Sequence, residues 1–212
     1  MKMKIFSGLL ILAFAGNIIL FFKNKSNAHN VPGNVAVNKE LAQLQMSETN
    51  NRVLQQTMQQ FMIEQFTNDG VQLPDHITLT GGEQIAANKL LPACHRVLVF
   101  LFDRNACSAC VEHELTNIAA LKEELHTDEV VILSSSFPTL TQAQLYIERF
   151  KVPYKVYNIA DTLGFTTEHL QQPCYFVLDD AKKTSLFFMP DKNNPSLSDS
   201  YLQIVRKRFF HH

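Results

Sequence analysis

The chain has 212 residues, 46% of them hydrophobic, which is enough for one folded domain with extensions. Its formal net charge of −1 gives no basis for nucleic-acid binding. Four cysteines are too few for a disulfide scaffold, and the sequence has no low-complexity stretch or internal repeat. Composition therefore indicates a globular domain with additional segments.

The N-terminal segment is typical of a membrane-spanning helix. Residues 5–22 carry no charge, and a run of this length is just sufficient to cross a bilayer. Lysines flank the run on both sides, so the positive-inside rule does not fix its orientation. Cleavage as a signal peptide after Ala15 is the alternative, but it would leave an apolar stretch near the new N-terminus. We expect an uncleaved signal anchor over residues 1–25.

A linker and a helix are predicted for residues 26–70. Residues 26–38 are polar and include a proline and a glycine, which favours a linker. Residues 39–66 have apolar side chains at helical spacing, which predicts one amphipathic helix with an interruption near 49–51. This helix would pack on the globular domain or hold it away from the bilayer. A dimerising role is the weaker alternative, because no heptad pattern persists.

The globular domain is expected over residues 71–212. Its predicted elements are a short strand at 77–80, a helical turn or loop at 83–91, a buried strand at 97–102 with a helix after it, a second buried strand at 129–134, a helix from 138, a strand within 152–159, an irregular segment at 161–172, a hairpin of strands 174–179 and 185–189, and a helix at 196–210. This order of elements predicts an α/β domain.

Two cysteines, Cys107 and Cys110, occur where the strand at 97–102 is followed by a helix. The strand residues are all apolar, which is typical of a strand buried on both faces of a sheet. After Cys110 the apolar positions return at helical spacing. A thiol in the first turn of a helix lies near unpaired backbone N–H groups and the positive end of the helix dipole. Both favour the thiolate, which is the reactive form.

The favoured interpretation of this Cys-x-x-Cys pair is a redox-active disulfide, and two alternatives stay open. The first is a structural disulfide. The second is half of a zinc site, for which the remaining ligand candidates are Cys94, His95, His113 and Cys174. No second Cys-x-x-Cys pair is present, so we expect no metal.

Three features together resemble the thioredoxin fold, and more narrowly the membrane-tethered thioredoxin-like proteins of the TlpA and ResA type. They are the apolar strand at 97–102, the Cys107-x-x-Cys110 pair, and Gln172-Pro173 directly before the strand at 174–179. The resemblance covers residues 71–212 and implies a central mixed β-sheet flanked by helices. It also implies a cis proline opposite the cysteines, for which Pro173 is the candidate.

The sequence departs from that family at several positions. Ala106 occupies the place of the thioredoxin tryptophan, and the buried acid of thioredoxin would fall near Leu101. Where ResA-like proteins have a glutamate three residues after the second cysteine, this chain has His113, followed by Glu114. A peroxiredoxin is disfavoured within the same fold, since Arg104 stands where those enzymes have a threonine.

The resemblance implies an extracytoplasmic thiol-disulfide oxidoreductase. Cys107 and Cys110 would be catalytic, Gln172 and Pro173 would contact the substrate, and His113 and Glu114 would tune the pair. No cofactor is expected beyond the cysteine disulfide itself. The implied partners are protein disulfides, a membrane thiol-transfer protein as electron donor, and the inner membrane, with the globular domain in the periplasm. A tethered binding module without turnover is the alternative function.

Overall fold

The structure is a computed structural model that describes residues 32–91, 96–166 and 171–210. The chain divides into two compact units, Met1–Thr57 and Met58–His212, and each is described by itself. The signal anchor expected over residues 1–25 lies outside the described residues. Among the helices that are described, none combines the length and the apolar character that a membrane span requires.

Helix α2 extends without interruption from Pro32 to Asn68. It therefore begins inside the stretch 26–38 that was predicted as a linker, and the predicted interruption at 49–51 is wrong. Proline is tolerated in the first turn of a helix, where its missing N–H has no helical partner. The residues at 49–51 are moderate helix formers, and neither proline nor glycine is among them.

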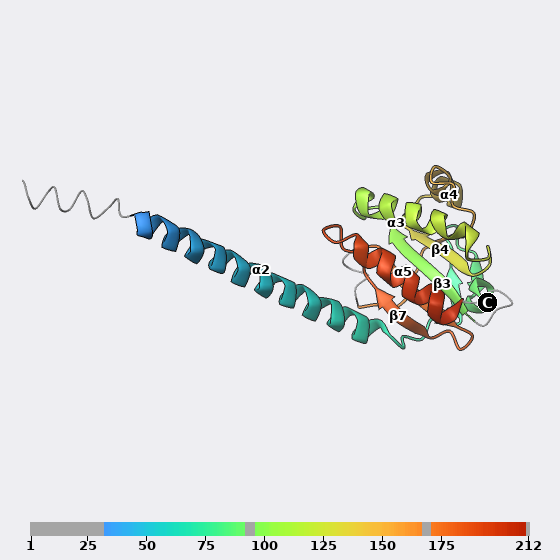
Figure 1. The fold of residues 1–212 in the computed structure, drawn as a ribbon. Coiled ribbons are helices and arrows are strands. Elements are labelled where there is room, and N and C mark those ends of the chain that lie inside the picture. The colour runs from blue at the N-terminus through green and yellow to red at the C-terminus, as the bar shows by residue number, and fades with distance from the viewer. Residues whose placement is uncertain (1–31, 92–95, 167–170, 211–212) are drawn as a thin grey trace, which may run out of the picture. The chain divides into compact units, whose positions relative to one another are not determined.

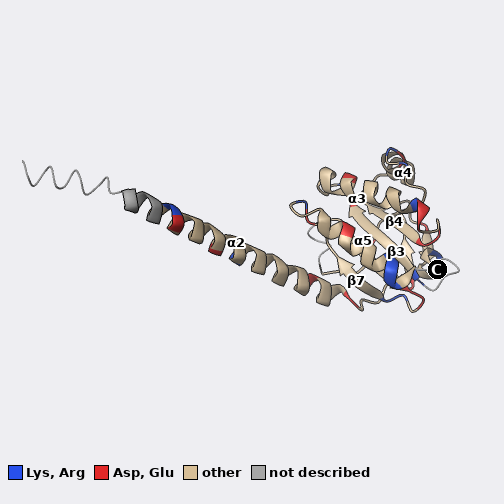
Figure 2. Ribbon diagram, viewed as in Figure 1, with Lys and Arg blue, Asp and Glu red and all other residues tan. Residues whose placement is uncertain are grey.

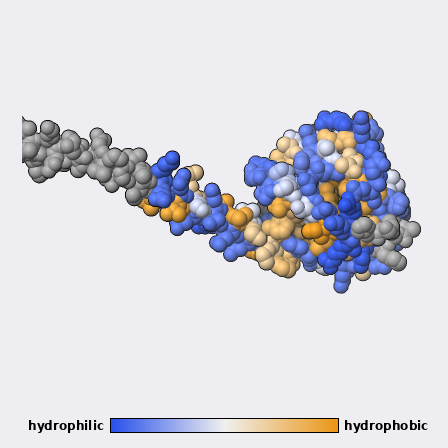
Figure 3. Space-filling view, in the orientation of Figure 1, coloured by the Kyte–Doolittle hydropathy of each residue, from blue (hydrophilic) through white to orange (hydrophobic). Residues whose placement is uncertain are grey.

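The amphipathic character predicted for this helix is also wrong. Its large apolar side chains are exposed and point in several directions around the axis: Leu41, Leu44, Met46, Val53, Leu54, Met58, Met62, Ile63 and Phe66. Hydrophobic and hydrophilic residues accordingly alternate along the described part of the helix in the space-filling view (Figure 3). Charged residues are sparse along it, as the mostly tan ribbon shows (Figure 2).

The second unit is built on a five-stranded mixed sheet in the order β5-β4-β3-β6-β7. The strands are β3 (Arg96–Asp103), β4 (Val130–Ser135), β5 (Lys155–Ile159), β6 (Cys174–Asp179) and β7 (Thr184–Phe188). β3, β4 and β5 are parallel, whereas β6 runs antiparallel to β3 and forms a hairpin with β7. All five strands lie where the sequence predicted them, with differences of at most three residues at their ends.

Strand β3 forms the centre of the unit because its residues are buried on both faces, as predicted. Leu98, Phe100 and Phe102 contribute to one hydrophobic core. That core also contains the apolar residues of α3 (Ser108–Ala120), α4 (Leu140–Glu148) and α5 (Ser196–Phe209), so all three helices cover the same face. Figure 1 shows α3 and α5 side by side over the strands.

The opposite face of the sheet is covered by the segment that follows α2. This segment contains β1 (His76–Thr78), β2 (Gln84–Ala86) and the short helix η1 (Ala87–Leu90), and its apolar residues pack against the other side chains of β3. β1 and β2 form an antiparallel hairpin. The prediction of a loop or helical turn over 83–91 thus missed strand β2.

The same segment forms hydrogen bonds with both edges of the sheet. At the β7 edge, the backbone N–H of Gly70 donates to the carbonyl of Thr184 at 2.7 Å. At the β5 edge, the N–H of Thr80 donates to the carbonyl of Asn158 at 2.8 Å. The chain between them crosses the sheet face, with Leu73 and Ile77 fully buried beneath it. The segment therefore fastens the two edge strands to each other.

This topology is a parallel β-α-β-α-β unit followed by an antiparallel hairpin and a terminal helix. The cysteine pair lies at the first β-to-α connection, between β3 and α3. Both features agree with the sequence prediction, and the mixed α/β arrangement is consistent with a thioredoxin-like fold.

Candidate active site

Cys107 occupies the N-cap position of helix α3, at the point where the chain leaves the central strand. Its carbonyl accepts hydrogen bonds from the N–H groups of Cys110 and Val111, at 3.0 and 3.1 Å. Its side chain is exposed, and the thiol is free. The first residue of the predicted pair is thus both accessible and adjacent to the positive end of a helix.

Cys110 lies one turn further along and is half-buried, also as a free thiol. Its thiol hydrogen-bonds the Cys107 sulfur, and this contact is the main cause of a Cys107 pKa below the ordinary value of 9.0. Burial, together with the Cys107 sulfur, raises the pKa of Cys110 to about 11. The pKa order predicted from the sequence agrees with this structure, but the main causes are the neighbouring thiol at Cys107 and burial at Cys110, with backbone N–H groups contributing less.

Glu114 is the buried acid of the site. Its side chain is 2% exposed, and its carboxylate accepts hydrogen bonds from the hydroxyls of Tyr175, at 2.9 Å, and Ser198, at 2.8 Å. Burial raises the pKa of this carboxyl, although both hydroxyls act in the opposite direction. Because Glu114 lines the same cavity as Cys110, a carboxyl group that can accept a proton lies beside the half-buried thiol.

His113, the second residue predicted to tune the pair, lies on the same cavity. Its ring is 43% exposed, and its Nε2 is 3.2 Å from the Asn117 amide nitrogen and 4.0 Å from the Glu114 carboxylate. The imidazole can therefore add positive charge near Glu114 when it is protonated.

Asp103 fixes the loop that leads from β3 to Cys107. Its carboxylate accepts hydrogen bonds from the Asn105 N–H at 2.7 Å, the Ser135 hydroxyl at 2.8 Å and the Ser136 hydroxyl. Burial alone would raise the pKa of Asp103, but these hydrogen bonds outweigh it and hold the pKa below 3.8. The loop is therefore tied to the end of strand β4 by an ionised carboxylate, which restricts the position of Cys107.

Gln172 and Pro173 do not have the geometry that the resemblance implied. No peptide bond between described residues is cis, so the Gln172–Pro173 bond is trans and the prediction of a cis proline is wrong. Pro173 is buried, and Cys174 after it pairs with Leu101 of β3, so both lie at the end of the sheet from which the Cys107 loop emerges. Gln172 is exposed and lines a separate cavity of about 330 Å³ at the strand ends, which neither cysteine of the pair lines.

The two alternatives to a redox pair, a structural disulfide and a zinc site, concern the same two cysteines. Cys107 and Cys110 are free thiols, and no group of three or more potential metal ligands occurs within the described ranges. Cys174 is 5% exposed and belongs to the core on the other face of the sheet. The remaining zinc-ligand candidates, Cys94 and His95, lie outside the described residues.

Comparison with known proteins yields distant structural likenesses only. No family model and no curated protein matches the chain. A peroxiredoxin Q variant of Xanthomonas campestris aligns at 12% identity and a TM-score of 0.46, over 66% of this chain and 98% of that one. Peroxidoxin BcpB of Mycobacterium tuberculosis aligns at 15% identity and 0.47, over 67% and 98%. A thiol:disulfide interchange protein from Bacteroides sp. aligns at 17% identity and 0.42, over 68% and 95%. At these values none of them transfers an activity or a residue role to this chain.

Sequence reasoning identified the two cysteines, His113 and Glu114 but missed four other members of the site. Asp103 directly follows the apolar run at 97–102, and the sequence gives it no pattern of its own. Tyr175, Ser198 and Lys192 belong to β6, α5 and the loop between β7 and α5, and no local pattern connects them to the cysteines. The sequence gives such a signal only for Glu114, which follows Cys110 by one helical turn and therefore lies on the same side of the helix.

Proposed function

We propose that this chain is a thiol-disulfide oxidoreductase that reduces protein disulfides through Cys107 and Cys110. The observation that carries the proposal is the difference between the two thiols. Cys107 is exposed and has a lowered pKa, whereas Cys110 is half-buried with a pKa of about 11. Thiol-disulfide exchange requires this difference in exposure and pKa. The nucleophile must be accessible and ionised to attack the partner, whereas the resolving thiol must stay protonated until the mixed disulfide has formed.

The reaction follows from these positions. The Cys107 thiolate attacks one sulfur of a partner disulfide, a mixed disulfide forms, and the other partner sulfur leaves as a thiolate. Cys110 then loses its proton and attacks the Cys107 sulfur, which releases the second partner thiolate and forms the Cys107–Cys110 disulfide. Two electrons pass to the partner, and a dithiol donor must return them.

Glu114 has the properties of the group that accepts the Cys110 proton. A thiol with a pKa of about 11 is a poor nucleophile near neutral pH unless a base assists it. Glu114 lines the cavity beside Cys110, and burial raises the pKa of its carboxyl toward the working range of a base. His113 lines the same cavity with a partly exposed ring and provides a path for the proton from Glu114 to solvent.

Insulin reduction with dithiothreitol as electron donor tests the proposal. The protein should accelerate precipitation of the insulin chains over the reagent alone, and Cys107→Ser should abolish the acceleration. Cys174→Ser is the matched control, because it removes a buried thiol that does not line the Cys110 cavity and should retain activity. Retained partner binding without turnover would instead favour the alternative function, a non-catalytic binding module.

The location proposed for this activity is the periplasmic side of the inner membrane, with residues 1–25 as an uncleaved anchor and a membrane thiol-transfer protein as electron donor. Its support is the uncharged run at residues 5–22. Fractionation and N-terminal sequencing test the anchor. A soluble product that starts after Ala15 would contradict it.

A further inference from the structure

The loop between β7 and α5 brings a basic side chain to the cysteine pair. The loop is held by its own hydrogen bonds: Asp191 accepts from the N–H of Asn193 at its side chain and from the N–H of Asn194 at its carbonyl, both at 2.9 Å. Pro190 and Pro195 restrict the backbone at its two ends. A loop built in this way holds the backbone of Lys192 in a defined place.

A cavity of about 220 Å³ lies between this loop and the first turns of α3. It is lined by Ala109, Cys110, His113 and Glu114 of the helix and by Pro190, Asp191, Lys192 and Pro195 of the loop. Lys192 is therefore the one permanently positive side chain in this lining. The lining from the helix includes Cys110, whose thiol contacts the Cys107 sulfur.

The other charged groups around the pair have partners. Glu114 is bonded to Tyr175 and Ser198, and Asp191 to the Asn193 N–H. On the loop before Cys107, Asp103 is bonded to two serines, and the Arg104 guanidinium lies over the Phe137 ring, 5.8 Å from its centre.

Lys192, in contrast, forms no ion pair with any residue of the described ranges. His113 is charged only when it is protonated, so it cannot supply a constant positive charge. The neighbouring thiol at Cys107 and burial at Cys110 dominate the two pKa values, and the Lys192 ammonium adds a smaller lowering contribution to each, as expected for a cation beside a sulfur anion.

We propose that Lys192 is a positioning residue that stabilises the anionic sulfur of Cys107 from the β7–α5 loop, an inference that rests on the thiol redox function proposed above. The charge acts on the attacking sulfur before substrate arrives. It also compensates the negative charge that Glu114 places near the pair when its carboxyl is ionised.

The test compares the alkylation rate of Cys107 by iodoacetamide in the reduced full chain across a range of pH, with the modified peptide quantified by mass spectrometry. Lys192→Gln should slow alkylation at mildly acidic pH by about two- to fivefold, the size that an exposed charge pair supports. Lys192→Arg should restore the wild-type rate. Molar salt should shrink the difference between the wild type and Lys192→Gln.

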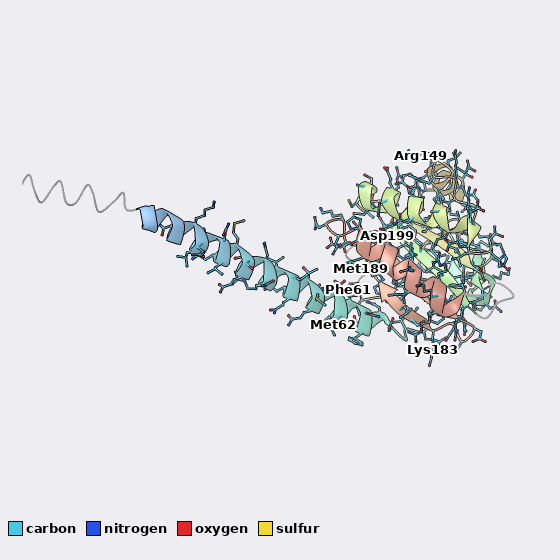
Figure 4. The ribbon with its side chains drawn as sticks, viewed as in Figure 1. Phe61, Met62, Arg149, Lys183, Met189 and Asp199 are labelled. Carbon is cyan, nitrogen blue, oxygen red and sulfur yellow. The ribbon has the colours of Figure 1, made fainter. Side chains whose placement is uncertain are left out.

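Lys183→Gln is the matched control, because it removes the same charge from the β6–β7 turn, at the opposite end of β6 from Cys174 (Figure 4). It should leave the rate unchanged. A wild-type alkylation profile in Lys192→Gln overturns the proposal, as does equal slowing in Lys183→Gln. Since alkylation needs no turnover, failure of insulin reduction would count against the oxidoreductase function alone, and a flat alkylation result against Lys192 alone.

Discussion

The Tyr175 hydroxyl donates a 2.9 Å hydrogen bond to the buried carboxylate of Glu114 and so connects strand β6 to the cysteine helix. Ser198 of α5 binds the second oxygen of the same carboxylate at 2.8 Å. One acid thus joins three elements of the fold while it lines the cavity beside Cys110. Glu114 therefore contributes both to the packing of the fold and to the proposed proton transfer, and its titration should affect both stability and activity.

Glu114→Gln should change how stability depends on pH. Burial raises the folded-state pKa of Glu114 above 4.5, so the folded protein binds more protons than the unfolded chain. The contribution of this group is fully present below its unfolded pKa and is lost as pH rises through the folded pKa. Urea denaturation from about pH 4 to about pH 8 should show the wild type losing stability relative to the variant.

Tyr175→Phe provides the control for this prediction. It removes a hydrogen bond that lowers the pKa of Glu114, so the pH window of the loss should move upward while the acid remains. Parallel stability curves for the wild type and Glu114→Gln would show that Glu114 does not titrate with a raised pKa.

The two cysteines should separate by role in a trapping experiment. Cys110→Ser leaves the exposed Cys107 to attack partners but removes the thiol that releases them, so mixed disulfides should accumulate. Cys107→Ser should trap little. Non-reducing electrophoresis and mass spectrometry of the adducts measure both, and equal trapping by the two variants would refute the assignment.

Alkylation should mark the thiols in a fixed order. With limiting iodoacetamide at about pH 6, Cys107 should react first, because its pKa is lowered and its side chain is exposed. Cys110, with a pKa of about 11, is almost fully protonated there, and Cys174 is buried. Peptide mass spectrometry reads the order, and labelling of Cys110 or Cys174 ahead of Cys107 would contradict it.

Phe61→Ala should destabilise the second unit by about 1–2 kcal/mol. Phe61 belongs to the last turns of α2 (Figure 4), is half-buried, and packs edge-to-face on Phe188 with ring centres 5.4 Å apart. Phe66→Ala is the control on the same helix, since Phe66 is 70% exposed and should cost little. Denaturant unfolding measures both, and equal effects would show that the end of α2 does not belong to this unit.

The sequence predicted the elements whose patterns are long and unmixed. The apolar run of β3 and the helical spacing after Cys110 identify the strand, the helix and the place of the cysteine pair. Strand β2 was missed because its three residues, Gln84 to Ala86, are too few to show an alternation. The sequence does not predict the full length of α2, because proline and asparagine favour helix ends, whereas this helix begins at Pro32 and continues through Asn50 and Asn51.

The rest of the site depends on contacts that no local pattern encodes. Tyr175 and Ser198 reach Glu114 from 61 and 84 positions away, and only the folded sheet brings them together. For Pro173, position alone suggested a cis bond, but an X-Pro bond is trans in most folded proteins, and this one is trans.

The segment that fastens both edges of the sheet has a consequence for recognition. Exposed edge strands offer unpaired backbone groups onto which another chain can add a strand. Here the carbonyls of Thr184 on β7 and Asn158 on β5 are already bonded to the protein's own backbone. Partners are therefore blocked from docking by β-augmentation at these two positions. Under the proposed function, partner disulfides meet the protein at the exposed Cys107, so the side chains around this sulfur would select the substrate.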